Sequence, residues 1–350
     1  MKQDRRGGGV TIFEAVITVC LALSEPAICR DQLLPGYEAA RLHDCTAALA
    51  ARPPSVAGVR CKAAGPTLEV HEVAPGVFVH MGEIAEPDMQ NRGDVTNLGF
   101  VIGSDAVAVI DSGTARWMGE GLWRAIRARS DKPVRYIVLT HMHPDHVLGA
   151  GVFAEAGAQV AGHAHLRRAL ADRRANYLQS LERLIGPEAF LGTDTPQVDI
   201  EVAAVLELDL GDRPLQVQAW PTAHTGNDVT VLDRTTGTLF AGDLVFDRHA
   251  PALDGSLVGW RRVLDTLAGM EVSRLIPGHG GPVLGWPEGA AAMQRYLEVL
   301  ERDTRAAIAA GARLGEAVEV IAASQAHVWE LFDAYNPRNA TVAFTELEWD

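Results

Sequence analysis

Positive charge is scarce in this chain. Its 31 lysine and arginine residues are outnumbered by 45 aspartate and glutamate residues, which gives a formal net charge of −14. A protein whose main partner is nucleic acid or an anionic membrane needs the opposite balance, because it must neutralise phosphate groups. The sequence also has no basic run and no basic patch with interleaved aromatic residues, so nothing in it favours nucleic acid or an anionic membrane as the main partner. We therefore expect a small-molecule substrate as partner, and no nucleic acid.

Cysteine is also scarce, and none lies beyond residue 61. The cysteines are Cys20, Cys29, Cys45 and Cys61, and no C-x-x-C pair is present, which argues against a cysteine-ligated zinc. In an oxidising compartment two of them would form a disulfide. We favour Cys45–Cys61, which closes a proline-containing loop, with Cys29–Cys45 as the alternative. The favoured pairing leaves Cys29 unpaired if Cys20 is lost with an export signal.

The sequence lacks an apolar stretch of the ~17 residues that a membrane-spanning helix requires. The longest candidate covers residues 10–23, after a basic start and before the small-x-small site Ala22-Leu23-Ser24. This order is typical of an export signal, although Glu14 is an unusual charge within one. We expect residues 1–24 to be such a signal, the protein to be periplasmic, and no stable membrane insertion after the signal is removed.

One short segment is rich in groups that bind metals. Between Thr140 and His146 the chain places His141, His143, Asp145 and His146 within six positions. Imidazole and carboxylate are the side chains that bind zinc and similar first-row metals. Four such groups so close together are costly to bury unless a cation or solvent compensates them. The segment therefore predicts a metal site.

The spacing within this segment favours two metal ions over one. Residues 134–140 are β-branched and apolar and predict a buried strand, so His141 and His143 leave its end on the same side. Pro144 then forces a turn, and Asp145 and His146 open a helix and point elsewhere. A single tetrahedral zinc needs three protein ligands and water, so the surplus indicates a second ion.

Further candidate ligands follow other strand-like segments on turns rich in glycine or proline. They are His224, Asp243 and His279, each at a turn where the backbone can approach a metal closely. Asp111 ends another apolar segment in the same way. We expect its carboxylate to orient a ligand from behind without touching the metal itself.

Taken together, these residues resemble the metallo-β-lactamase fold superfamily. Its hallmark H-x-H-x-D-H, a later histidine, an aspartate after glycine and a final histidine all occur in order, and the resemblance covers roughly residues 68–300. It implies two zinc ions per chain. The implied ligands are His141, His143 and His224 for one ion, Asp145, His146 and His279 for the other, and Asp243 as the bridge.

A narrower resemblance rests on three further stretches. The later histidine, His224, is followed by Thr225-Gly226-Asn227-Asp228, whereas many hydrolases of the superfamily have Thr-Pro-Gly-His at this point. The pattern found here is similar to that of the sulfur-oxidation SoxH type. Residues 29–37 and 344–349 resemble the quinoprotein relay system zinc metallohydrolases. These accompany periplasmic quinoprotein dehydrogenases, so the resemblance implies a functional link to such an enzyme but identifies no substrate.

Strands and helices alternate in two similar successions over residues 66–310. This alternation predicts an α/β (α+β) catalytic domain, an αββα sandwich of two mixed β-sheets flanked by helices. One of its strands is expected over residues 200–209. We expect residues 25–65 to form a small cysteine-containing module with a helix at about 36–51, and residues 311–350 to form a helical tail that ends in a short extended piece.

The expected function is that of a periplasmic binuclear zinc hydrolase of an ester, lactone, thioester or amide. A metal-bridging hydroxide would attack, and Asp145 would assist proton transfer. Iron or manganese could occupy the same ligands, so an iron-dependent oxidoreductase is an alternative. A non-catalytic accessory protein of a quinoprotein pathway is another. Because loops set substrate choice, we expect the pocket walls at residues 81–94, 166–199 and 248–260.

Overall fold

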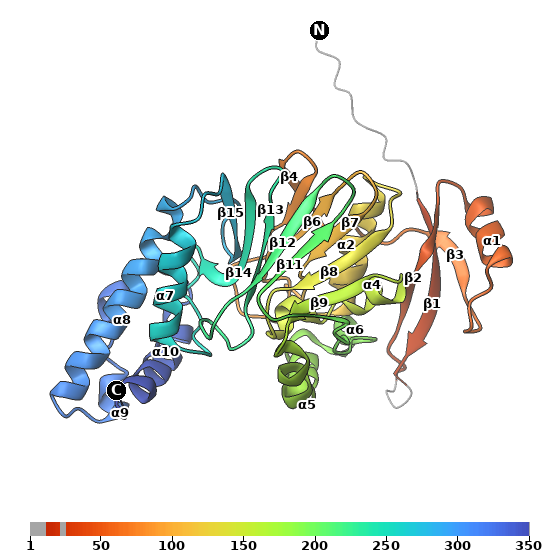
Figure 1. The fold of residues 1–350 in the computed structure, drawn as a ribbon. Coiled ribbons are helices and arrows are strands. Elements are labelled where there is room, and N and C mark those ends of the chain that lie inside the picture. The colour runs from red at the N-terminus through yellow and green to blue at the C-terminus, as the bar shows by residue number, and fades with distance from the viewer. Residues whose placement is uncertain (1–11, 22–25, 350) are drawn as a thin grey trace, which may run out of the picture.

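The computed structural model describes residues 12–21 and 26–349, and its centre is a pair of sheets packed face to face (Figure 1). The larger sheet is antiparallel from β4 to β7 and parallel from β7 to β10. Its strands, in spatial order, are β10 (Ile200–Val202), β9 (Gln159–His163), β8 (Val134–Leu139), β7 (Val107–Ile110), β6 (Leu98–Ile102), β5 (Val77–His80) and β4 (His71–Ala74).

The smaller sheet is antiparallel apart from its last pair, β14 and β15, which run parallel. Its strands, in spatial order, are β11 (Val205–Asp209), β12 (Pro214–Ala219), β13 (Val229–Asp233), β14 (Thr238–Phe246) and β15 (Arg274–His279). Both sheets therefore mix parallel and antiparallel pairs, as the sequence predicted.

The inner faces of the two sheets share one apolar core. Val79 and Val138 of the larger sheet are fully buried in the same cluster as Val231 and Phe240 of the smaller sheet. Gly99 on β6 lies where the Phe240 ring crosses, and a Cβ there would come within 2.3 Å of that ring. Only glycine lets the sheets approach this closely.

Helices cover both outer faces, which confirms the αββα sandwich. The helices beside the larger sheet are α2 (Arg116–Arg127), α3 (Pro144–Val147), α4 (Gly151–Glu155), α5 (Leu166–Ile185) and α6 (Pro187–Phe190). Those beside the smaller sheet are α7 (Leu257–Ala268), η1 (Glu288–Ala290), α8 (Ala291–Ala309), α9 (Leu314–Ala317), η2 (Ala323–Gln325) and α10 (Phe332–Leu347). Each group buries an apolar stripe against its sheet.

The single strand expected over residues 200–209 is two strands in different sheets. β10 pairs with β9 in the larger sheet, and β11 pairs with β12 in the smaller one. Ala203 and Ala204 carry the chain from one sheet to the other, and the carbonyl of Ala204 accepts a bond from Ala219 N. Periodicity alone cannot show that a strand changes partners.

The N-terminal module is a three-stranded sheet with one helix. Its central strand is β1 (Phe13–Cys20), between β2 (Cys29–Ala39) and β3 (Arg60–Ala63), and its helix is α1 (Leu42–Ala51). The helix expected from residue 36 thus starts later, because the chain is still extended in β2 at that point.

Two disulfides cross-link this module, Cys20–Cys29 and Cys45–Cys61. The predicted Cys45–Cys61 pair is confirmed. The expectation that Cys29 stays unpaired is wrong in this structure, whereas loss of Cys20 with a signal stays a prediction. Cys20 ends β1 directly opposite Cys29, which opens β2, and this antiparallel pairing brings their sulfur atoms together.

The expected export signal overlaps this module. Residues 13–20 pair with β2 on one side and with β3 on the other, so cleavage after residue 24 would remove the centre of the sheet. The basic start and the expected cleavage site, Ala22-Leu23-Ser24, lie outside the described residues. Within residues 12–21 and 26–349, no helix is long and apolar enough to cross a bilayer.

The C-terminal tail is helical to its last described turn and docks on the sandwich. The short extended piece expected at its end is instead part of α10. Asn339 on α10 accepts a bond from Leu253 N and donates one to Pro251 O. Glu346 accepts bonds from Ser256 Oγ and Leu257 N, at the start of α7. The tail thereby holds the loop that precedes α7.

Candidate metal centre

The seven predicted ligands converge near the carboxyl ends of strands from both sheets. β8 leads into His141 and His143, and α3 carries Asp145 and His146. Asp243 lies on β14, His279 ends β15, and His224 lies in the loop between β12 and β13. They form two groups whose ligand atoms lie within 4.8 Å of one another. These groups are His141, His143, His224 and Asp243, and Asp145, His146 and His279.

Asp243 lies at the centre of both groups. Its Oδ2 is 3.7 Å from His141 Nε2, 3.5 Å from His224 Nε2 and 3.4 Å from His279 Nε2. Its Oδ1 is 3.2 Å from His146 Nε2. One carboxylate thus faces imidazoles of both groups, which is the geometry of a bridging ligand. Asp145 lies 3.3 Å from His279 Nε2 on the outer side.

Backbone carbonyls fix the orientation of two of these imidazoles. His224 Nδ1 donates to the Ala252 carbonyl at 2.6 Å, and His279 Nδ1 donates to the Val95 carbonyl at 2.8 Å. A carbonyl can only accept, so in the neutral ring the proton sits on Nδ1 and the Nε2 lone pair points at the centre. Metal-binding histidines are held in this way.

Asp111 holds two more imidazoles from behind. Its Oδ2 accepts from His146 Nδ1 and from Thr140 Oγ1, both at 2.8 Å, and its Oδ1 accepts from Thr140 N. Because the Thr140 hydroxyl donates to Asp111, its oxygen is free to accept from His141 Nδ1 at 3.0 Å. Asp111 adopts a positive φ of 58°, a strained conformation that aspartate tolerates better than most residues.

His143 is oriented by a carboxylate that the sequence pattern did not reveal. Its Nδ1 lies 3.0 Å from His224 Nε2, inside the cluster, while its Nε2 lies 3.2 Å from Asp254 Oδ2. Arg173 donates to the same oxygen from α5. Asp254 sits in an irregular loop with no motif around it, so only the folded chain reveals its role.

The electrostatics of the cluster suit a cation. Burial, reinforced by neighbouring imidazoles, lowers the pKa of His141, and burial lowers that of His224 to about 3, so both rings are neutral and offer lone pairs. Burial opposes ionisation of Asp243, but His279 and His146 outweigh it and hold its pKa well below its usual value. Burial likewise opposes protonation of His279, yet Asp243 and Asp145 raise its pKa to about 9.

One orphaned atom supports the same conclusion. His141 Nε2 is buried and makes no hydrogen bond in the described part of the chain. An unpaired buried nitrogen is costly unless something absent from the protein chain binds it. Five imidazoles and two carboxylates suit zinc, iron or manganese. The residues present therefore fit a metal centre.

The cluster opens beside His143 and Asp145, whose side chains stay 19% and 18% exposed. Two tyrosines lie near this opening. The negative charge of Asp145 acts on both Tyr177 of α5 and Tyr335 of α10 and adds to the larger effect of burial, which raises both pKa values. The predicted pocket wall at 166–199 thus supplies Tyr177, whereas the contribution of α10 was not expected.

Tyr335 reaches the metal cluster through a chain of contacts. Burial, helped by the negative charge of Glu86 in the expected wall at residues 81–94, raises the pKa of the Tyr335 hydroxyl. The Tyr335 ring lies 4.8 Å from that of His249, which in turn lies 4.8 Å from the ring of His279. Burial, with His279 nearby, lowers the pKa of His249 to about 4, so this imidazole is a neutral packing partner.

Trp260 and His163 lie outside the ligand groups. Trp260 is fully buried, donates to the Leu244 carbonyl and packs its indole 5.2 Å from the His224 ring. It therefore supports a ligand from the core side. His163, at the end of β9, packs on His165 and belongs to neither group.

The chain belongs to the metallo-beta-lactamase superfamily, because the sequence model of that family matches residues 91–279, more than half of its length. Among curated proteins, it is similar to the type A flavoprotein fprA of Rhodobacter capsulatus, with 33% identity over 194 residues. That alignment covers 53% of this chain and 40% of the flavoprotein.

Solved structures agree on the fold. A metallo-beta-lactamase from Pontibacter korlensis superposes with a TM-score of 0.54 at 22% identity, over 66% of this chain and 99% of that one. The DIM-1 metallo-beta-lactamase gives a TM-score of 0.52 at 19% identity, over 67% and 98%. At these identities the likeness establishes the architecture and leaves the activity open.

Proposed function

We propose that this member of the superfamily is an exported binuclear zinc hydrolase of an ester, lactone, thioester or amide. The observation that carries the proposal is the position of Asp243, whose carboxylate faces imidazoles of both ligand groups within 3.7 Å. Together the seven side chains offer three imidazoles to one cation, two imidazoles and a carboxylate to the other, and one shared carboxylate.

Two zinc ions in this centre would supply a water nucleophile at neutral pH and polarise the scissile carbonyl. The chain's own residues do the rest. Asp111 and the carbonyls of Val95 and Ala252 hold the histidines in place, so no reorganisation is needed at the moment of reaction. Asp145, ionised and partly exposed, is placed to take a proton from the attacking water and return it to the leaving group.

An iron-dependent oxidoreductase is the second candidate, and one observation favours it. The similar curated protein is named a flavoprotein, and histidine and carboxylate ligands hold iron as readily as zinc. The hydrolase remains our first proposal, because the superposed structures are titled metallo-beta-lactamases and the superposition covers nearly the whole of each of those chains. An accessory protein without catalysis would tolerate loss of ligands, whereas this chain retains every one.

Export to the periplasm and a link to a quinoprotein dehydrogenase belong to the same proposal. Two disulfides support an oxidising compartment. The stretches that resemble quinoprotein relay proteins, residues 29–37 and 344–349, fall largely in β2 and at the end of α10. Both flank the proposed catalytic domain of residues 66–310.

Elemental analysis of the purified protein, combined with a substrate panel, tests the proposal. We expect about two zinc ions per chain and turnover of at least one substrate among nitrocefin, a lactone and a thioester. The H143A variant should lose metal and turnover together, while H163A, which removes a histidine outside the cluster, should keep both. Bound iron, together with turnover that depends on oxygen or on an electron donor, would favour the oxidoreductase. One ion or fewer in a fully loaded preparation would contradict the binuclear centre.

A further inference from the structure

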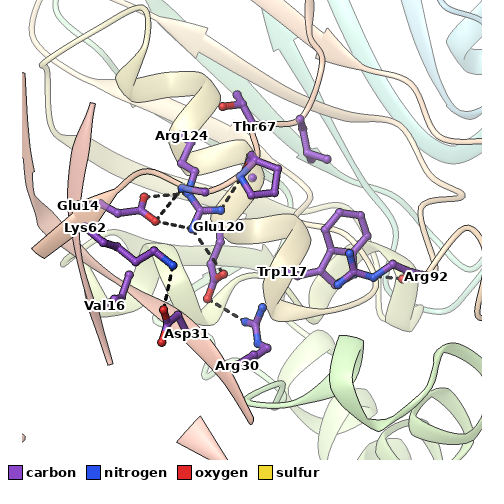
Figure 2. A pocket seen from close by; sticks show the side chains of 14 residues that line it. Glu14, Val16, Arg30, Asp31, Lys62, Thr67, Arg92, Trp117, Glu120 and Arg124 are labelled. Atoms are coloured by element: carbon purple, nitrogen blue, oxygen red, sulfur yellow. Dashed lines mark hydrogen bonds and ion pairs between the residues drawn. The ribbon is translucent and has the colours of Figure 1, made fainter. Parts of the chain in front are cut away.

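A cavity of about 380 Å³ lies between the N-terminal module and α2, and none of its lining residues is a proposed metal ligand (Figure 2). Figure 2 shows Glu14 and Lys62 on one side and Trp117 with Arg92 on the other. Val16 and Leu68 add apolar surface. A volume of this size accommodates a small organic molecule.

Most of the charges around this cavity are already paired. Glu14 forms a two-bond pair with Arg124, at 2.8 and 2.9 Å, and Asp31 pairs with Lys62 at 2.9 Å. Glu120 accepts from Arg30 Nη2 at 2.9 Å. Such pairs hold the module on α2 but leave little for a ligand.

Two guanidinium groups nevertheless keep hydrogen-bond donors to spare. Arg30 uses Nε on the Leu191 carbonyl and Nη2 on Glu120, and its Nη1 makes no bond to any described residue. Arg92 lies 4.7 Å over the Trp117 ring and pairs with no carboxylate in the described part of the chain. With four cations and three carboxylates on its lining, the cavity carries one excess positive charge.

The backbone at Arg92 is held in a conformation that costs energy. Its φ is +55°, a region that arginine seldom adopts. The Trp117 Nε1–H donates to the Arg92 carbonyl at 3.1 Å while the guanidinium covers the same indole. The two contacts together set the arginine over the ring, and strain of this kind concentrates at sites that bind ligands.

We propose that this cavity binds a small aromatic carboxylate. The carboxylate would take the unused donors of Arg92 and Arg30, because a guanidinium matches a carboxylate with two parallel bonds. The ring would lie against Trp117 and the apolar wall at Val16 and Leu68, since aromatic rings stack on indole. This site is separate from the metal centre and does not depend on the hydrolase proposal.

Titration of the intact protein with 2-naphthoate tests this site. Calorimetry gives the affinity, and the indole N–H resonance of Trp117, assigned with the W117F variant, reports the location. We expect saturable binding that shifts this resonance and is weakened about tenfold in R92Q. The neutral isostere 2-naphthamide should bind the wild type at least about tenfold more weakly than 2-naphthoate does, because it lacks the charge.

Matched control variants test whether 2-naphthoate binds in this cavity. Arg129 also lies over an aromatic ring, 5.2 Å from Phe78, but lines no part of the cavity, so R129Q should bind like the wild type. The D243A variant should also bind normally, which excludes a carboxylate bound to metal. The proposal is overturned by no saturable binding up to 10 mM, by equal affinity in R92Q, or by loss of binding in D243A.

Discussion

The chain buries two clusters of ionisable side chains that differ in how their charges are paired within the protein. At the interface between the module and α2, Glu120 accepts from Arg30, Arg116 and the Leu33 amide, and Glu14 is matched by Arg124. Each carboxylate there meets guanidinium groups within the protein. In the metal centre, hydrogen bonds satisfy the outward nitrogens, while the inward atoms face one another around Asp243.

This difference separates a structural cluster from a binding one. Buried charges persist when they are paired, and the glutamate–arginine cluster is complete without help. The histidine–aspartate cluster leaves His141 Nε2 unpaired and turns five imidazoles and two carboxylates toward one centre, so a bound cation would complete it. Residue type alone does not distinguish the two, since both are rich in buried titratable groups.

Removal of the shared carboxylate should give the largest effect. We expect D243A to hold less than one metal ion per chain and to lose about 10³-fold in kcat/KM, because several kcal/mol of charge stabilisation disappear. Metal analysis and turnover of the same preparation measure this. E120A, which removes an equally buried carboxylate from the other cluster, should keep its metal. A D243A protein that holds two metal ions and has normal turnover would contradict the distinction between the two clusters.

The E120A variant should lose more stability than a variant at an exposed glutamate. E120A removes the carboxylate partner of Arg30 and leaves Arg116 with only the more exposed Glu155, so we expect the free energy of unfolding to fall by about 3 kcal/mol. The midpoint of urea unfolding measures this change, provided that the dependence of the unfolding free energy on urea concentration is the same in both proteins. E201A breaks an exposed pair with Arg167 and should cost less than about 1 kcal/mol. If the two variants proved equally stable, the glutamate–arginine cluster would not be what holds the module.

Local spacing was enough to predict four of the seven proposed ligands, whereas the assignment of the full set followed from the family resemblance. His141, His143, Asp145 and His146 follow one strand within six positions, and their directions depend only on a strand, a proline turn and a short helix. Residues that act through distant contacts left no such pattern. Asp254 and Tyr335 reach the centre only because the C-terminal tail and the loop before α7 pack together.

The N-terminal module shows where local patterns were not enough. Residues 13–20 are apolar enough to resemble a signal, yet Val16, Ile17, Thr18 and Val19 are all β-branched and favour a strand. Glu14, the charge that did not suit a signal, is explained by its pair with Arg124, 110 residues away. A contact over that separation is invisible to local periodicity, although the β-branched run was a usable warning.

Weakening the support behind the ligands should give an intermediate effect. In D111N one oxygen that accepts from Thr140 and His146 becomes an amide, so we expect metal affinity to fall about 10- to 100-fold. Asparagine tolerates the positive φ at this position, so backbone strain should not confuse the result. Competition with a chelator measures the affinity. An unchanged affinity would show that Asp111 only closes the turn after β7.

The smallest effect should come from Asp31, a partly exposed carboxylate at the edge of the module. A bond from Lys62, opposed by burial and joined by bonds from Thr18 and Arg60, holds its pKa below its usual value. A lowered pKa stabilises the fold above about pH 4, and this contribution is lost as the pH falls below that value. Because the pairs are solvent-screened, D31N should cost at most about 1 kcal/mol at pH 7.

Unfolding of chelator-treated wild type and D31N at pH 7 and pH 2.5 measures this, and prior removal of metal excludes a contribution from metal release in acid. The gap between the two proteins should shrink at the lower pH, because the Asp31 carboxylate takes up a proton in the unfolded chain while it is still ionised in the folded one, which favours unfolding of the wild type. A gap of the same size at both pH values would mean that Asp31 acts by its hydrogen-bonding shape alone. The module would then be held by geometry at its rim and by charge only at Glu14 and Glu120.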